Sequence, residues 1–325
     1  MVFKRLKKLA ALLVILCLAV PGSVQAQFNL PECQTYEFVK RDSALYLDVY
    51  KPANPREDRA AVISLFGGGF FSGARNNREM KQVAQALLEH GFTVISIDYR
   101  LGFQDKEMVA SHSKLLKLTD LFQYCIDIAT EDCAAAVAWT CANAQMLDID
   151  PSKIILTGSS AGAISVLQMD YCRANSLEAA SVLPAGWKPA AVIPFSGGIM
   201  CHKRELKYKS DPAPTMLMHG KKDKIVNYKG FGLPFSSKLF GSKRVSKAMD
   251  RQDIPHWFIS FEDVGHEVAI WLPGSIDIFC AFVDMALAGR ATTLEADMTD
   301  SDLKPTQWAQ MSILQLYGGG GPRNR

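Results

Sequence analysis

Short, continuously apolar runs alternate with helical patterns along most of this sequence, and that alternation restricts the fold more than any other feature. The apolar runs occupy residues 60–66, 92–97, 154–157, 190–195, 214–219 and 256–261. Helical spacing of apolar residues occupies 78–90, 134–147, 162–172 and 276–287. Strands that are apolar on both faces and alternate with helices form parallel sheets covered on both sides. We therefore expect an α/β fold with a mostly parallel central sheet and helices on both faces.

Residues 1–26 have the three parts of a secretory signal peptide. The basic start consists of Lys4, Arg5, Lys7 and Lys8. An apolar run over residues 9–20 follows, and small residues at Val24 and Ala26 precede Gln27. This run is shorter than the ~20 residues that span a bilayer, so an uncleaved anchor is the less favoured alternative. We expect a secreted or periplasmic protein with no stable membrane insertion after cleavage of the signal.

The charge balance argues against binding to nucleic acid. Removing the four positive charges of the leader from the formal net charge of +3 leaves a mature chain at −1. A near-neutral body does not provide the basic surface that phosphate contacts require.

The cysteines leave two pairings open. Without Cys17 of the leader, an odd number remains of the eight cysteines, so at least one thiol is free or pairs between chains. Cys125 can pair with Cys133 if the helix breaks between them, and Cys172 can pair with Cys201. Buried free thiols are the alternative. The Cys and His spacings match no zinc template, and we expect no metal.

We expect one folded domain at 27–290, followed by a polar tail at 291–325 with one helix over about 303–317. Residues 101–133 form a longer connection than the others. Apolar residues recur there at helical spacing, which predicts an extra amphipathic helix within this insert: Leu115, Leu118, Phe122, Cys125, Ile126 and Ala129.

The strongest chemical signal is the sequence GSSAG at residues 158–162. It follows the apolar strand at 154–157 and precedes a helix, which is the strand–turn–helix setting of a nucleophilic serine. The turn is so tight that side chains at Gly158 and Gly162 would clash. Ser160 then stands at a helix N-terminus, whose free N–H groups favour a developing oxyanion. We expect Ser160 to be the nucleophile.

A glycine-rich loop, FGGGF at residues 66–70, follows an earlier strand. Glycines there let backbone N–H groups approach a tetrahedral intermediate with no Cβ in the way. We expect Gly68, Gly69 and Ala161 to form an oxyanion hole.

These motifs resemble the α/β-hydrolase superfamily, specifically secreted carboxylesterases of the hormone-sensitive-lipase-like and feruloyl/acetyl-esterase-like branch. The resemblance runs from about residue 46 to 287, and its marks are YLDVYKP, FGGGF, DYRLG, DPSKIILTGSSAGA, HGKKDKIV and GHEV. It implies an α/β-hydrolase fold. The family usually has His where this chain has Phe66.

The resemblance implies that Asp223, in HGKKDKIV, is the acid of a triad in the chain order Ser–Asp–His. His266 follows the last apolar strand, and Gly265 allows a tight loop that returns the imidazole to the sheet edge. His266 is therefore the expected base, which takes the proton of Ser160 and passes it to the leaving group. Glu262 and Asp263 are rival acids but stand at the wrong place in this order.

Phe70, Phe71 and Met200 follow strand ends and are expected to line an apolar substrate pocket, although core packing explains single aromatic residues equally well.

Together these features predict a secreted serine esterase that needs no cofactor. The resemblance and the leader imply a small-molecule or carbohydrate ester as substrate, with a short acyl or hydroxycinnamoyl group. A secreted peptidase of the prolyl-oligopeptidase type is one alternative, although the glycine-rich loop favours an esterase. A noncatalytic binding protein on the same scaffold is the other, and it would be expected to lack a member of the triad.

Overall fold

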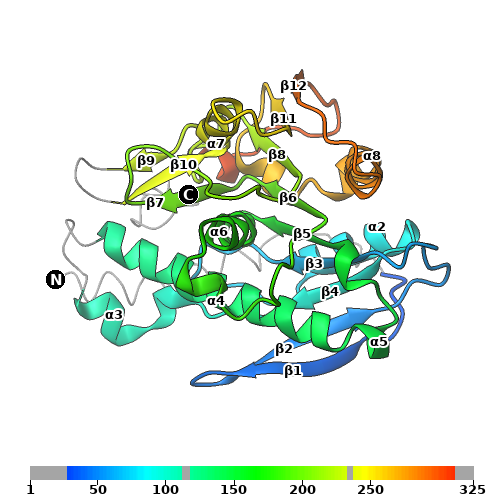
Figure 1. Cartoon of the computed structure of the whole chain (residues 1–325). Helices are drawn as coiled ribbons and strands as arrows, with labels where there is room; N and C mark the ends of the chain where they lie inside the picture. Colours follow the sequence, from blue (N-terminus) through cyan, green and yellow to red (C-terminus); the bar gives the residue numbers. More distant parts are fainter. Residues whose placement is uncertain (1–27, 112–117, 233–236, 312–325) are drawn as a thin grey trace, which may run out of the picture.

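The computed structural model describes residues 28–111, 118–232 and 237–311 (Figure 1). The expected signal peptide at residues 1–26 lies outside the described residues. Within them, no helix has both the length and the apolar character needed to cross a membrane.

A nine-stranded sheet forms the centre of the described part of the chain, in the order β1-β2-β4-β3-β5-β6-β8-β11-β12. β1 pairs antiparallel with β2, and β2 with β4, while all later neighbours are parallel. The strand bounds are β1 Gln34–Lys40, β2 Ala44–Tyr50, β3 Ala61–Leu65, β4 Thr93–Ile97, β5 Ile154–Ser159, β6 Ala191–Phe195, β8 Thr215–Gly220, β11 His256–Phe261 and β12 Leu294–Met298. Every residue of β3, β4, β5, β6 and β8 is buried, which explains their continuous apolar sequences. The expected mostly parallel sheet is confirmed.

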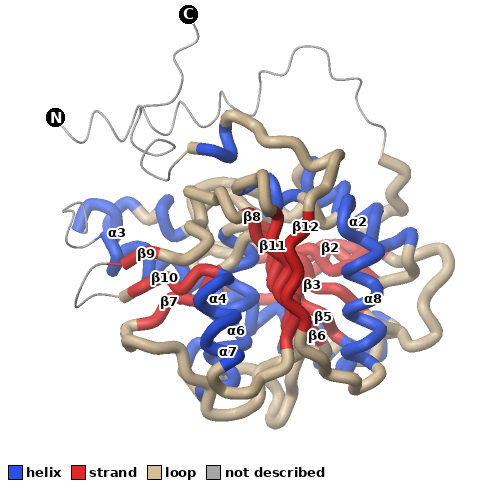
Figure 2. Tube along the Cα trace, turned by 90° about the horizontal axis from the view of Figure 1, so that it is seen from above, coloured by secondary structure: helices blue, strands red, loops and turns tan. Residues whose placement is uncertain are grey.

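Helices cover both faces of this sheet, as expected (Figure 2). α2 (Arg78–Glu89) and α8 (Ile276–Leu287) lie on one face, where Leu87 and Phe279 join a common core. α4 (Leu118–Ala142), α6 (Ala161–Asn175) and α7 (Ser242–Asp250) lie on the other face. A small second sheet beside them contains β7 (Gly198–Cys201), β10 (Lys238–Gly241) and β9 (Phe231–Gly232).

The expected boundary between an insert at 101–133 and a following helix is wrong. A short 3-10 turn at Gly102–Gln104 and helix α3 (Lys106–Ser111) precede α4, which then continues unbroken through residue 133 to Ala142. Ala134 and Val137 of the later part pack in the same core as Cys125 and Ile126 of the earlier part. The continuous buried face makes this segment one helix of the fold.

The seven described cysteines are all free. Cys125 and Cys133 lie on unbroken α4, where eight residues at ~1.5 Å each separate them by more than a disulfide can bridge. Cys172 and Cys201 are both buried without being bonded to each other. Burial raises the pKa of Cys125, Cys133 and Cys172 to about 12, as expected for inert core thiols.

The sheet extends past the domain boundary expected at residue 290. β12 adds to the sheet edge in parallel register with β11 and pairs Trp257 with Leu294. The chain after β12 remains packed on the domain, because Leu303 and Ala309 are both buried. The helix expected over about 303–317 is a single 3-10 turn, Trp308–Gln310, within the part that the structure describes.

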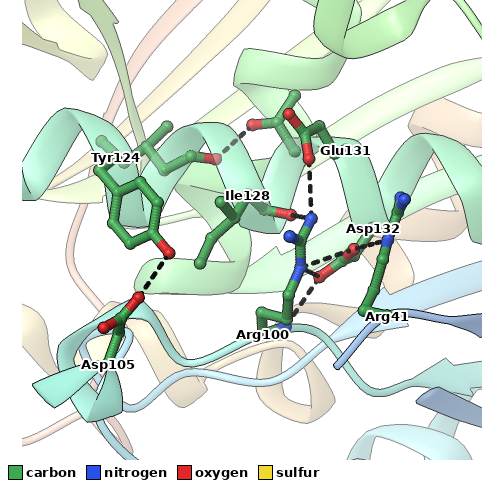
Figure 3. Close-up of polar contacts among 9 residues, drawn as sticks. Arg41, Arg100, Asp105, Tyr124, Ile128, Glu131 and Asp132 are labelled. Carbon is green, nitrogen blue, oxygen red and sulfur yellow. Dashed lines mark hydrogen bonds and ion pairs between the residues drawn. The ribbon is translucent and has the colours of Figure 1, made fainter. Parts of the chain in front are cut away.

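A cluster of charged residues holds α4 against the chain that follows β4 (Figure 3). The Asp132 side chain is fully buried, and its Oδ2 accepts hydrogen bonds from the Arg100 backbone N–H at 2.9 Å and from Arg100 Nε at 2.8 Å. Arg41 Nε donates to the other oxygen, Oδ1, at 3.1 Å. Arg100 Nη2 also donates to the Ile128 carbonyl and to the more exposed Glu131. One buried carboxylate thus joins three segments that are distant in sequence.

Candidate active site

Ser160 stands in the tight turn between β5 and α6, with a φ of +51°. A Cβ on Gly158 would lie 2.4 Å from the carbonyl carbon of Gly162, and a Cβ on Gly162 would lie 2.3 Å from the Leu65 carbonyl oxygen. Both glycines are therefore required by close backbone approach. The left-handed conformation of a serine is strained, and it is held here by the Ser160 N–H, which donates to the Phe195 carbonyl at 3.0 Å.

The structure brings together the three residues that the sequence analysis selected. His266 Nε2 lies 2.8 Å from Ser160 Oγ, and His266 Nδ1 lies 2.7 Å from Asp223 Oδ2. Ser160 follows β5, Asp223 follows β8 and His266 follows β11. The carboxyl ends of parallel strands meet at one edge of the sheet, which places residues 106 positions apart in hydrogen-bond contact.

Asp223 is held ionised and oriented by its surroundings. Its Oδ1 accepts the backbone N–H groups of Ile225 and Val226 at 2.9 and 3.0 Å. Burial by itself would raise the pKa of Asp223, but the charge of His266 and hydrogen bonds from His219 and His266 hold it well below the ordinary carboxyl range. The carboxylate can therefore orient the imidazole and stabilise its protonated form throughout the mildly acidic and neutral range.

The glycine-rich loop lies against the serine. A Cβ on Gly67 would be 3.3 Å from the Ser160 Cβ, and one on Gly68, at φ +123°, would be 1.9 Å from the Ser72 carbonyl oxygen. Gly69 is also left-handed, with a φ of +64°. The first N–H groups of α6, beginning at Ala161, have no acceptor within their own helix. The predicted donors Gly68, Gly69 and Ala161 are thus on the two segments that flank Ser160.

Phe66 stands where the family that the sequence resembles usually has His, and it supports this loop by aromatic packing. Its ring stacks on Tyr99 at a centroid distance of 4.3 Å, and the Tyr99 hydroxyl donates to the Phe66 carbonyl at 2.7 Å. A Cβ on Gly73 would lie 2.3 Å from the Phe66 ring, so the far end of the loop closes over the same ring.

Two of the three residues expected to line a substrate pocket are buried in the core. Phe70 is fully buried and meets Tyr99 and Phe122 edge to face, and Met200 is also buried. Phe71 alone of the three is partly exposed. The expectation fails because Phe70 packs against Phe122 of α4, and Met200 is itself part of β7 in the small second sheet, which the sequence did not predict.

Glu79 of α2 is a neighbour of the site that sequence reasoning missed. It lines a small cavity of about 10 Å³ together with Gly158, Ser159 and Leu272. The carboxylate is hydrogen-bonded to Ser159, while its Oε1 is buried with no hydrogen-bond partner in the described residues. Burial raises the pKa of Glu79, against the opposing effects of Ser159 and the charge of His266. An acidic residue in the first turn of a helix is ordinary, so no local signal marked it.

Glu79→Gln is expected to stabilise the protein at pH 8. Because the folded state binds the Glu79 proton more tightly than the unfolded chain does, the ionised carboxylate lowers the free energy of unfolding above its folded pKa. This cost in stability disappears below the pKa that Glu79 has in the unfolded chain. The stability gained by Glu79→Gln should therefore shrink as the pH falls to 4. Urea unfolding at both pH values measures it, with the exposed Glu89→Gln of the same helix as control. An equal effect at both pH values would contradict the raised pKa.

The described residues contain no group of three or more His, Cys, Asp or Glu side chains placed to hold a metal ion.

The sheet, the serine turn and the Ser–His–Asp contacts define an α/β-hydrolase fold. The BD-FAE family model matches residues 47–111 and 123–181. The structure is similar to esterase 2 of Thermogutta terrifontis, solved as the protein phosphoramylated by tabun, with a TM-score of 0.56 and 19% identity. That likeness covers 84% of this chain and 99% of the other.

Among curated proteins, the chain is similar to Lipase 2 of Moraxella sp. (strain TA144), at 32% identity over 105 residues. This match covers 32% of this chain and 20% of the lipase. It is also similar to Cholinesterase 1 of Branchiostoma lanceolatum, at 29% identity over 130 residues, covering 38% of this chain and 32% of the cholinesterase. The chain thus spans a third or less of the length of these curated relatives.

Proposed function

We propose that this chain is a secreted serine esterase that hydrolyses short-chain acyl or hydroxycinnamoyl esters, including those on carbohydrate. The observation that carries the proposal is the continuous contact from Ser160 Oγ through His266 to Asp223, with distances of 2.8 and 2.7 Å. The BD-FAE match and the esterase and lipase relatives support ester hydrolysis. The basic and apolar pattern of residues 1–26 supports export, which we place in the periplasm or outside the cell.

The geometry supports a two-step acyl transfer. Ser160 Oγ attacks the ester carbonyl carbon while His266 Nε2 takes the hydroxyl proton. The N–H groups of Gly68, Gly69 and Ala161 stabilise the resulting oxyanion, and one such donor contributes about 3 kcal/mol. The intermediate then expels the alcohol, which receives the proton from His266. Water attacks the acyl-serine by the same route, giving the acid product and the free serine.

We expect turnover of p-nitrophenyl esters to fall with acyl length, by about tenfold in kcat/KM between butyrate and octanoate. Phe70 and Met200 are packed in the core, so neither side chain offers an apolar surface to a long acyl chain. A long chain would therefore leave apolar carbon in water. The purified mature chain is assayed against acetate, butyrate and octanoate.

An Ala-Pro p-nitroanilide in the same assay separates esterase from peptidase. Activity on the anilide alone would replace this proposal with a peptidase. Labelling of Ser160 by a fluorophosphonate, located by peptide mass analysis, separates an enzyme from a noncatalytic binding protein. An unlabelled, folded protein that turns over none of the substrates would contradict the proposed function.

A further inference from the structure

The chain after β12 returns to the loop that carries His266 (red end of the colour range in Figure 1). Leu303 and Ala309 are buried, and Trp271 Nε1 donates to Asp300 Oδ2 at 3.1 Å. A Cβ on Gly265 would lie 2.8 Å from the Ala309 carbonyl oxygen. Residues 300–311, which we call the C-terminal strap, are therefore packed against the residues on both sides of His266.

Glu267 fastens the strap to the histidine loop. Glu267 is only 2% exposed, and its Oε2 accepts the Gly265 N–H at 2.7 Å. The other oxygen, Oε1, accepts both the backbone N–H and the hydroxyl of Thr306, and it lies 3.5 Å from Gln310 Nε2. A buried carboxylate with this many donors holds one geometry, because each broken contact would leave a buried charge less well paired.

The contacts of Glu267 with the C-terminal strap place the indole of Trp308 beside the imidazole of His266. The two ring centroids are 6.1 Å apart at an interplanar angle of 86°, and the Trp308 side chain is half-buried. In the proposed reaction, His266 Nε2 gives its proton to the leaving alcohol oxygen, so the alcohol half of the ester leaves from the histidine side of Ser160. An indole on that side offers a flat apolar surface to the alcohol.

We propose that Trp308 is a specificity-determining residue that contacts the alcohol half of the substrate and favours alcohols that contain a ring. This inference rests on the proposed esterase function and deepens it. A ring stacked against an indole gains contact area that an ethyl group does not, and such pairs add to binding beyond simple burial. The preference is thus assigned to a segment that was expected to be a polar tail.

The test compares benzyl butyrate with ethyl butyrate, which share the acyl group and differ in the alcohol. We expect Trp308→Ala to lower kcat/KM for benzyl butyrate about tenfold through KM, and to change ethyl butyrate less than about twofold. Trp308→Phe should recover most of the benzyl preference because it restores a ring. Gln307→Ala, an exposed neighbour on the strap, is the matched control and should leave both substrates unchanged.

Equal losses of kcat on both esters in Trp308→Ala would overturn the inference, because they would mean that Trp308 only supports His266. Unchanged kinetics on both esters would overturn it as well. Circular dichroism and the Tm of both variants identify a folding defect. If Trp308→Ala is misfolded, the ratio of kcat/KM for benzyl butyrate to that for ethyl butyrate in Trp308→Phe decides the inference. Wild-type turnover of ethyl butyrate tests the proposed function separately, since that substrate lacks the ring. If the wild type hydrolyses neither ester, both proposals fail.

Discussion

Replacing Ser160 with alanine is expected to lower kcat/KM for p-nitrophenyl acetate by about 10⁵- to 10⁶-fold. The Ser160 hydroxyl is the oxygen that His266 Nε2 contacts, at 2.8 Å, so its removal takes away the proposed nucleophile. The glycine loop and the substrate contacts remain and should keep a small residual rate. Burst-phase and steady-state kinetics measure the loss.

Ser159 provides the matched control, because it is the neighbouring serine of the same turn. Its side chain is hydrogen-bonded to Glu79 on the other side of the turn. Ser159→Ala should therefore cost less than about tenfold in kcat/KM, since no proton transfer passes through it. A comparable collapse in both variants would show that the turn, rather than the Ser160 hydroxyl, accounts for the loss.

The triad should also behave as one unit. Asp223→Asn is expected to reduce kcat by about 10⁴-fold, because an amide no longer holds the imidazole in the required orientation and charge. Adding Asp223→Asn to Ser160→Ala should then cost little more, since the proton relay has lost its donor. If Asp223→Asn lowers kcat in the Ser160→Ala background as much as it does in the wild type, the two residues do not act as one unit.

Asp132→Ala is expected to lower the free energy of unfolding by about 3–5 kcal/mol. The Asp132 side chain is fully buried and pairs with both Arg41 and Arg100, so its removal leaves two guanidinium groups without their main partner. The hydrogen bonds from the Arg100 backbone N–H and Nε to Asp132 are lost together. Urea unfolding followed by circular dichroism measures the change.

Glu131→Gln tests whether the burial of Asp132, rather than its charge alone, accounts for the expected loss of stability. Glu131 pairs with the same Arg100, but its side chain is 43% exposed. Exposed pairs contribute about 0–1 kcal/mol, so this variant should stay close to the wild type. If the two variants lose the same stability, the buried position of Asp132 does not account for its effect.

The central sheet was predictable because burial on both faces leaves a direct mark on sequence. The strands β3, β4, β5, β6 and β8 are buried at every position and rich in apolar residues, and β5 leads into a turn whose glycines follow from backbone contacts of 2.3–2.4 Å. The three residues of the candidate triad were predictable for a related reason. Each follows a parallel strand, and the carboxyl ends of such strands lie together.

The continuity of α4, the ninth strand and the burial of Phe70 were not predictable in the same way. α4 has apolar residues on more than one side, so its period does not show where one helix ends and the next begins. β12 is a mostly exposed edge strand, LEADM, with charged residues in place of an apolar run. Such a sequence joins a sheet only because β11 offers it free backbone groups.

The sequence by itself determined the alternating strands and helices, the serine turn and the chain order of Ser160, Asp223 and His266. These features depend on local backbone sterics and on burial patterns of a few residues. Only the tertiary structure decided which charges meet at Asp132, which carboxylate lies behind the serine turn, and which aromatic ring lies beside His266. Those contacts join segments far apart in the chain, and each residue involved is locally an ordinary Asp, Glu or Trp. Their effects arise from the burial and close packing that folding alone produces.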